Sequence, residues 1–224
     1  MERLCGYARL RSGFRLFRLT NSNFNANCGP IDTQRSVRGH MVVLMGIYGR
    51  IMDASNLPRP LYYASIIEAA LMDWYSLVQD KIDISLQDER LANDDDYWLK
   101  LYTKVMYHGA YILLYRETFG ELCHIPLLSE IQRKILLSCV SSASSIVGIS
   151  YTIGKVNPKN FHICPFIDFC WYLAGFIYLK LKNSRHTTNL SEDSFNVVLK
   201  SLEIKSNFSN FASVLLQGLS QNNL

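Results

Sequence analysis

The feature of this sequence that most constrains its fold is the spacing of its apolar residues, which recur every three or four positions through most of the chain. That spacing places them on one face of an α-helix, whereas a half-buried strand would alternate at every second position. Little of the chain alternates in that way, so we expect an all-α, multi-helix fold. The seven periodic segments lie at about residues 41–52, 61–78, 94–113, 131–150, 165–182, 195–202 and 211–219.

Residues at the ends of these segments support the same prediction. Ser129 followed by Gln132 is a capping-box pattern, which marks the N-terminus of a helix. Pro165 suits the first position of a helix, where its missing N–H group is not needed. Gly154 and Pro158 are expected to end the helix that begins near residue 131.

The segment at 131–150 shows how the buried face of a helix is predicted. Apolar or small residues recur along it at helical spacing, and they would share one side of the helix. The predicted inner face consists of Ile131, Ile135, Cys139, Ala143, Ile146 and Ser150.

Charge is distributed unevenly along the chain, whose net charge is +4. Residues 1–38 contain seven arginines against Glu2 and Asp32, a balance of +5, so residues 39–224 sum to −1. A nearly neutral body offers no basic stripe for phosphate groups, so we expect DNA to be reached only indirectly. We divide the chain into an Arg-rich arm and linker at residues 1–30, expected to be disordered, and a helical domain at 31–224.

The six cysteines favour reduced, buried thiols and an intracellular compartment. No two of them have the two-residue spacing of a zinc knuckle or a redox motif, and secreted disulfide scaffolds carry cysteines more densely. His162, Cys164 and Cys170 also fit no zinc-ligand pattern. We therefore expect no metal site in this chain.

Catalytic signatures are missing from the sequence. It contains no nucleophile elbow, phosphate loop, dinucleotide fingerprint or zincin helix. Asp94, Asp95 and Asp96 are consecutive, so on a helix they point about 100° apart and suit the positive end of the helix dipole better than a metal ion. His108 falls within an apolar helix as a core or boundary residue. We expect that the chain is not an enzyme and holds no cofactor.

Two segments raise the alternative of a helical membrane protein, with spans near residues 135–154 and 163–179. The first contains no charged residue, and the second contains only Asp168. However, six serines make the first segment a poor hydrocarbon solute, and an unpaired carboxylate at mid-bilayer is unfavourable. With 49% apolar residues among 224, the chain has ample material for a core in water, so we expect no membrane contact.

One stretch, Tyr107-His108-Gly109-Ala110-Tyr111-Ile112-Leu113-Leu114-Tyr115-Arg116-Glu117-Thr118-Phe119, carries a family resemblance. It resembles the segment of the regulatory (middle homology) domain of fungal-specific zinc-cluster transcription factors in which an aromatic-His pair leads through an apolar helix to Leu-Leu-His-Arg-Pro. Tyr115 stands where that family usually has His, and Glu117 where it usually has Pro.

Four further segments occur in the order of that family, so that the resemblance covers about residues 36–182. Residues 38–53 are similar to its early helix, and residues 71–77 to its Leu-x-x-Trp-x-x-x-Leu-Pro segment, although Val78 and Gln79 replace the final Leu and Pro. Residues 139–146 are similar to its Cys-x-x-Ala-Ala-x-x-Ile helix, and residues 165–175 to its Pro-Phe and Ala-Gly helix.

The motif positions read mainly as structural residues. Arg116 is expected near the end of a long helix, holding its last carbonyl groups or a carboxylate such as Glu117 or Glu121. Small residues on the two following helices would permit close helix approach. The motif positions are His108, Arg116, Cys139, Ala143, Pro165 and Gly175.

The resemblance implies a regulatory or interaction module of a nuclear transcription factor that controls transcription by RNA polymerase II. Its partners would be transcriptional co-regulators, a small-molecule effector, or activation and DNA-binding segments within the same protein. The binuclear zinc cluster of the family is missing, so zinc is expected only in a separate DNA-binding domain, and we expect a fragment or a paralogue. The Arg-rich N-terminus also leaves open a mitochondrially targeted helical protein.

Overall fold

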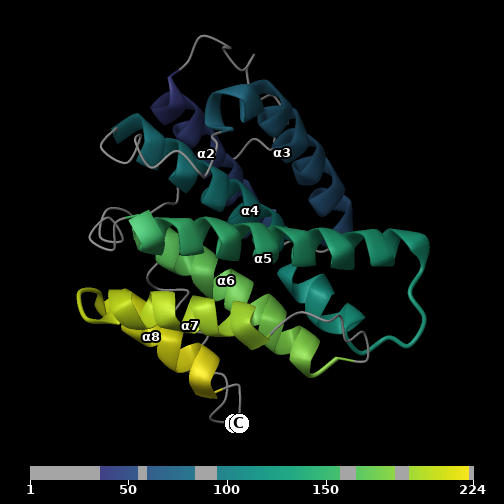
Figure 1. The fold of residues 1–224 in the computed structure, drawn as a ribbon. Coiled ribbons are helices and arrows are strands. Elements are labelled where there is room, and N and C mark those ends of the chain that lie inside the picture. The colour runs from purple at the N-terminus through teal and green to yellow at the C-terminus, as the bar shows by residue number, and fades with distance from the viewer. Residues whose placement is uncertain (1–35, 55–59, 84–94, 157–164, 185–191, 222–224) are drawn as a thin grey trace.

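The computed structural model describes residues 36–54, 60–83, 95–156, 165–184 and 192–221, and these form an all-α fold (Figure 1). No strand occurs in these ranges, and each of the seven predicted segments is a helix. The Arg-rich arm and the linker after it lie outside the described residues. The helices are α2 (Val37–Ala54), α3 (Pro60–Ile82), α4 (Asp95–Leu122), α5 (Glu130–Val156), α6 (Pro165–Lys182), α7 (Glu192–Ser206) and α8 (Asn210–Gln221).

Helices that are close in sequence are also close in space. In Figure 1, α2 and α3 lie at one end with α4, α5 crosses the middle, and α7 and α8 lie at the other end. Helix α4 packs against α2, α3, α5 and α6, and α6 packs against α4, α5, α7 and α8. All the substantial contacts join helices that are neighbours or next neighbours in the chain. The helices α4 and α6 therefore form the centre of the molecule.

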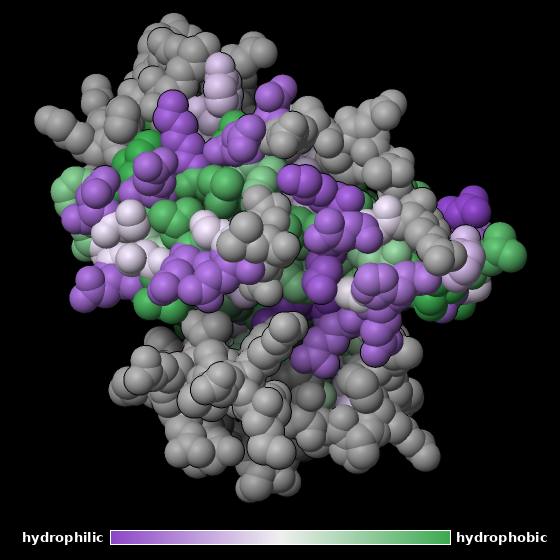
Figure 2. Space-filling model, turned by 90° about the horizontal axis from the view of Figure 1, so that it is seen from below, coloured by the Kyte–Doolittle hydropathy of each residue, from purple (hydrophilic) through white to green (hydrophobic). Residues whose placement is uncertain are grey.

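One continuous apolar core runs through these helices. Its largest fully buried side chains include Trp74 of α3, Phe119 of α4 and Trp171 of α6. Seen from the side of α7 and α8, the described surface mixes hydrophilic and hydrophobic residues (Figure 2). The amphipathic periodicity of the sequence therefore corresponds to real inner and outer helix faces.

The helix starts follow the sequence signals. The Ser129 N–H donates to Gln132 Oε1 at 2.9 Å, and the Gln132 N–H donates back to Ser129 Oγ at 3.4 Å, which confirms the capping box. Pro165 is the first residue of α6, as predicted. Helix α5 ends at Val156, between Gly154 and Pro158, as their stop signals predicted.

The predicted inner face of α5 was correct except at its start. Cys139, Ala143, Ile146 and Ser150 are buried and Ile135 is partly buried. Ile131, however, is 74% exposed, because it lies in the first turn of α5, beyond the edge of the core. Apolar character alone therefore did not locate the helix end relative to its neighbours.

Two glycines allow helices to approach closely. A Cβ atom on Gly109 of α4 would lie 2.5 Å from Cys170 Sγ of α6 and 2.7 Å from Tyr48 Oη of α2. A Cβ atom on Gly175 of α6 would lie 2.6 Å from a methyl group of Leu219 in α8. Both distances are far below van der Waals contact, so these helix pairs require glycine at these positions.

Among the described helices, α5 alone is long enough and apolar enough to cross a membrane, over Glu130–Ile153. Only 39% of the apolar window in this range is buried in the protein. The second predicted span corresponds to α6, which carries Asp168, Lys180 and Lys182 within 18 residues. Length and composition also fit a helix of a soluble protein, so they do not decide between the two environments.

Candidate functional site

The family-like stretch at residues 107–119 lies within α4, at the centre of the fold. His108 is half-buried, and its Nδ1 atom is buried without a hydrogen-bond partner among the described residues. Burial, and secondly the nearby Lys104, lower the pKa of His108 to about 4. The imidazole is therefore neutral at physiological pH, as suits a core or boundary residue.

Arg116 does not end its helix as expected. Helix α4 continues to Leu122 and carries no basic residue in its last turn. Arg116 instead forms an ion pair with Glu117, with 3.5 Å between Nη2 and Oε1, and the Glu117 side chain is exposed. The predicted carboxylate contact is therefore confirmed, whereas the predicted contact with the helix end was wrong.

Three of the other motif positions, Cys139, Ala143 and Gly175, lie at helix–helix contacts. Cys139 and Ala143 of α5 are fully buried, as expected for small residues facing neighbouring helices. Gly175 of α6 receives Leu219 of α8 and Val198 of α7. These positions determine how closely the helices pack.

Two tyrosines of the α4 motif bind one carboxylate of α3. Tyr111 Oη donates to Glu68 Oε1 at 2.7 Å, and Tyr115 Oη donates to Glu68 Oε2 at 2.6 Å. We call these three residues the Glu68 clamp. Tyr111 and Tyr115 are buried and Glu68 is partly buried, so the clamp joins α3 to α4 at the edge of the core. Hydrogen bonds to a charged group are about twice as strong as neutral ones.

Burial keeps the two tyrosines of the Glu68 clamp, and two nearby cysteines, in their protonated forms. Burial, and then the hydrogen bonds to Glu68, raise the pKa values of Tyr111 and Tyr115 well above the ordinary tyrosine value. Burial raises the pKa of Cys139 in the same way, and that of Cys123 to about 11. None of these four groups is activated as a nucleophile, because each is held more firmly in its protonated form.

Aromatic side chains extend this contact between α3 and α4. Tyr75 and Tyr107 stack with 4.2 Å between their ring centroids, and Trp74 stacks against the same Tyr107 at 6.1 Å. The Trp74 indole N–H donates to the backbone carbonyl of His40 in α2 at 3.1 Å. The motif helix is therefore fixed to α3 by rings and by the Glu68 clamp, and Trp74 links α3 to α2.

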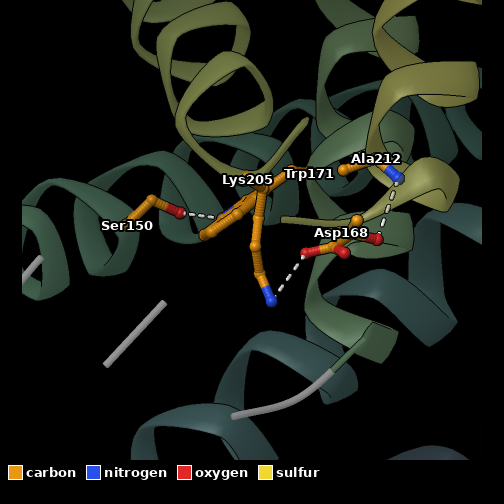
Figure 3. A network of polar contacts seen from close by, with 6 residues as sticks. Ser150, Asp168, Trp171, Lys205 and Ala212 are labelled. Carbon is orange, nitrogen blue, oxygen red and sulfur yellow. Dashed lines mark hydrogen bonds and ion pairs between the residues drawn. The ribbon is translucent and has the colours of Figure 1, made fainter. Parts of the chain in front are cut away.

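A second polar group lies between α6 and α7. Asp168 Oδ1 is 3.5 Å from Lys205 Nζ, and both side chains are buried (Figure 3). One turn further along α6, the Trp171 indole N–H donates to Ser150 Oγ of α5. Burial raises the pKa of Asp168 to about 6, although Lys205 opposes that rise.

The sequence did not predict either of these polar contacts. Asp168 was treated as an unpaired carboxylate, whereas the structure pairs it with Lys205 from a helix about 40 positions later. A single acid in an otherwise uncharged segment was the available signal. Nothing in the sequence around Glu68 indicated a partner for its carboxylate, because Glu68 follows the apolar Ile67 in a helix that carries both polar and apolar residues.

The described residues contain no group of three or more His, Cys, Asp and Glu side chains placed to hold a metal ion. Comparison of the chain with protein-family models, curated proteins and solved structures finds no match.

Proposed function

We propose that this chain is a regulatory and interaction module of a fungal transcription factor related to the zinc-cluster family. It would act in the nucleus, on transcription by RNA polymerase II. It would reach DNA only through a partner or another segment, and it would respond to co-regulators or to a small-molecule effector. Neither a cofactor nor a catalytic residue is part of the proposal.

The observation that carries this proposal is the position of the family-like stretch. The resemblance concerns an all-helical domain, and the stretch at 107–119 lies in the central helix of an all-α fold. Two of its residues, Tyr111 and Tyr115, form the Glu68 clamp. Tyr115, which replaces the usual His, keeps a polar hydrogen at that position. A regulatory domain needs such fixed helix contacts, because a signal passes between sites through packed elements.

The remaining family-like segments also lie in helices. They correspond to α2, α3, α5 and α6, on both sides of α4. Cys139, Ala143 and Gly175 are buried where helices meet, which agrees with the structural roles that the resemblance implies for them.

Transcription from a reporter gene tests the proposal. The full chain is fused to an unrelated DNA-binding domain and expressed in a fungal cell. We expect transcription to differ several-fold from that produced by the DNA-binding domain alone. A folding-deficient control, Trp74→Ser, removes a fully buried indole and should abolish the difference. A folded fusion present in the nucleus with no effect on transcription would contradict the proposal.

A further inference from the structure

Helices α7 and α8 pack against each other, and both pack against α6. We call them the C-terminal hairpin. At Gly175, the missing side chain leaves room for Leu219 of α8 and Val198 of α7. Seven residues earlier, about 10 Å along the helix, Asp168 of α6 forms its ion pair with Lys205 of α7. One apolar contact and one ionic contact therefore hold the hairpin on the same helix.

The ion pair between Asp168 and Lys205 leaves the buried carboxylate with few compensating contacts. Asp168 is 0% exposed and Lys205 is 3% exposed, so water does not solvate either charge freely. Neither carboxylate oxygen of Asp168 has a hydrogen bond among the described residues, and the 3.5 Å approach of Lys205 is long for a charged hydrogen bond. A buried carboxylate with so little compensation favours its protonated form.

Asp168 faces one opposite charge from the helices around it. Helices α4, α5, α7 and α8 pack against α6, and among their described residues only Lys205 of α7 acts electrostatically on Asp168. Helix α5 contributes the neutral Ser150, which accepts from Trp171. At the start of α8, the Ala212 N–H is already bonded to a serine hydroxyl (Figure 3). Within the described ranges, Lys205 is therefore the charge that opposes the protonation of Asp168.

We propose that docking of the C-terminal hairpin on α6 takes up a proton at Asp168, so that the hairpin binds more tightly as the pH falls from 7 to 5. When the hairpin is released, Asp168 is exposed to water and regains its ordinary acidity. The exchange involves one proton taken from solvent and no other reactant.

The direction of this pH dependence follows from the pKa of Asp168 in the docked state and in the released state. In the docked state, burial raises the pKa of Asp168 from its ordinary 3.8 to about 6. The docked state therefore holds the proton more strongly, and its advantage is complete below about pH 4 and lost as the pH rises through 6. Between pH 7 and pH 5 this linkage strengthens docking by about tenfold.

Release of the hairpin would expose an apolar seam. Val198 and Leu202 of α7 and Leu215 and Leu219 of α8 are all buried in the docked state. The acidity of the surroundings would thus control how often this seam is open to a partner.

Native-state hydrogen exchange on the full chain tests this proposal. Protection factors of the α7 and α8 amides, corrected for intrinsic exchange, should be about tenfold higher at pH 5 than at pH 7. The increase should vanish in Asp168→Asn and persist in Asp193→Asn, which changes an exposed acid in the first turn of α7. In Lys205→Met the response should move to higher pH, because the opposing charge is gone.

Three results would overturn the proposal. The first is an unchanged pH response in Asp168→Asn. The second is an equal rise in protection throughout α2 to α4, which would assign the proton to global unfolding. The third needs no variant: a carbon-detected NMR titration that places the Asp168 pKa below about 4.5 would remove the cause of the effect.

Discussion

At the scale of single residues, the Glu68 clamp is the contact most open to a direct test. Tyr115→Phe removes one hydroxyl donor, so the Glu68 carboxylate keeps only Tyr111. Because the lost bond involves a charged acceptor, we expect the free energy of unfolding to fall by about 1.5–3 kcal/mol, measured by urea denaturation.

Tyr107→Phe on the same helix is the matched control. The Tyr107 ring stacks on Tyr75, and a phenylalanine would keep that stacking. We expect a change within about 0.5 kcal/mol for this variant. Equal losses in the two variants would mean that the hydrogen bond to Glu68 does not contribute to stability.

Gly109 gives a second test at this scale. In Gly109→Ala the new methyl group would collide with Cys170 Sγ and Tyr48 Oη, so α2, α4 and α6 would have to move apart. We expect a loss of about 1–3 kcal/mol in the free energy of unfolding, the usual range for overpacking.

Gly148→Ala is the matched control, because the added methyl group has free space at this position. Gly148 is an exposed interior residue of α5, and no atom lies within 4 Å of its added Cβ. Alanine is the better helix former there, so thermal denaturation should show a gain of about 0.5–1 kcal/mol. A loss at Gly148 as large as that at Gly109 would contradict the proposed close contact.

At the scale of the helix, α5 has one face exposed to solvent and one face buried in the core. Two adjacent serines lie on these different faces. Ser141 is exposed and Ser142 is buried. Ser141→Lys should change the free energy of unfolding by no more than about 0.5 kcal/mol. Ser142→Lys should lower it by more than about 2 kcal/mol, because it buries an unpaired charge. Similar losses in both variants would mean that another surface covers the outer face of α5.

Helix positions and many of their ends could be predicted from the sequence, because both depend on local chemistry. The capping box at Ser129 and the proline at 165 act within one turn of the helix that they start. The end of α4 was misjudged at Arg116, because a basic residue suits a helix interior as well as its end. The buried Phe119 and Leu122 continue the helical spacing of Ile112 and Tyr115 beyond Arg116, and α4 runs on to Leu122.

The polar contacts were harder to predict than the helices. Tyr115 lies 47 positions from Glu68, and Lys205 lies 37 positions from Asp168. Periodicity indicates which face of a helix is buried, but not which helix faces it or at what height. Tyr115 could be selected as a motif position, whereas its acceptor could not.

At the scale of the whole molecule, the length and apolar composition of α5 raise the question whether the protein lies in water or in a membrane. We expect the full chain to remain in the supernatant after alkaline extraction of membranes from the cells that express it, because the buried face of α5 is fixed by α4, α6 and α7. Its outer face contains Ser141 and Ser144, which suit water. Retention in the membrane pellet, beside a known integral membrane protein as control, would instead favour the membrane alternative.

The order of helix contacts affects how the protein can fold while the ribosome synthesises it. Because the substantial contacts of each helix are with helices no more than two places away, an emerging helix finds its partners among those just made. At any time, only the two or three most recently synthesised helices would have an apolar face that is not yet packed against a partner. Contacts between helices that are close in sequence also favour rapid folding, since little chain entropy is lost when each pair meets. Synthesis from the N-terminus would thus build this fold in the same order in which its helices lie.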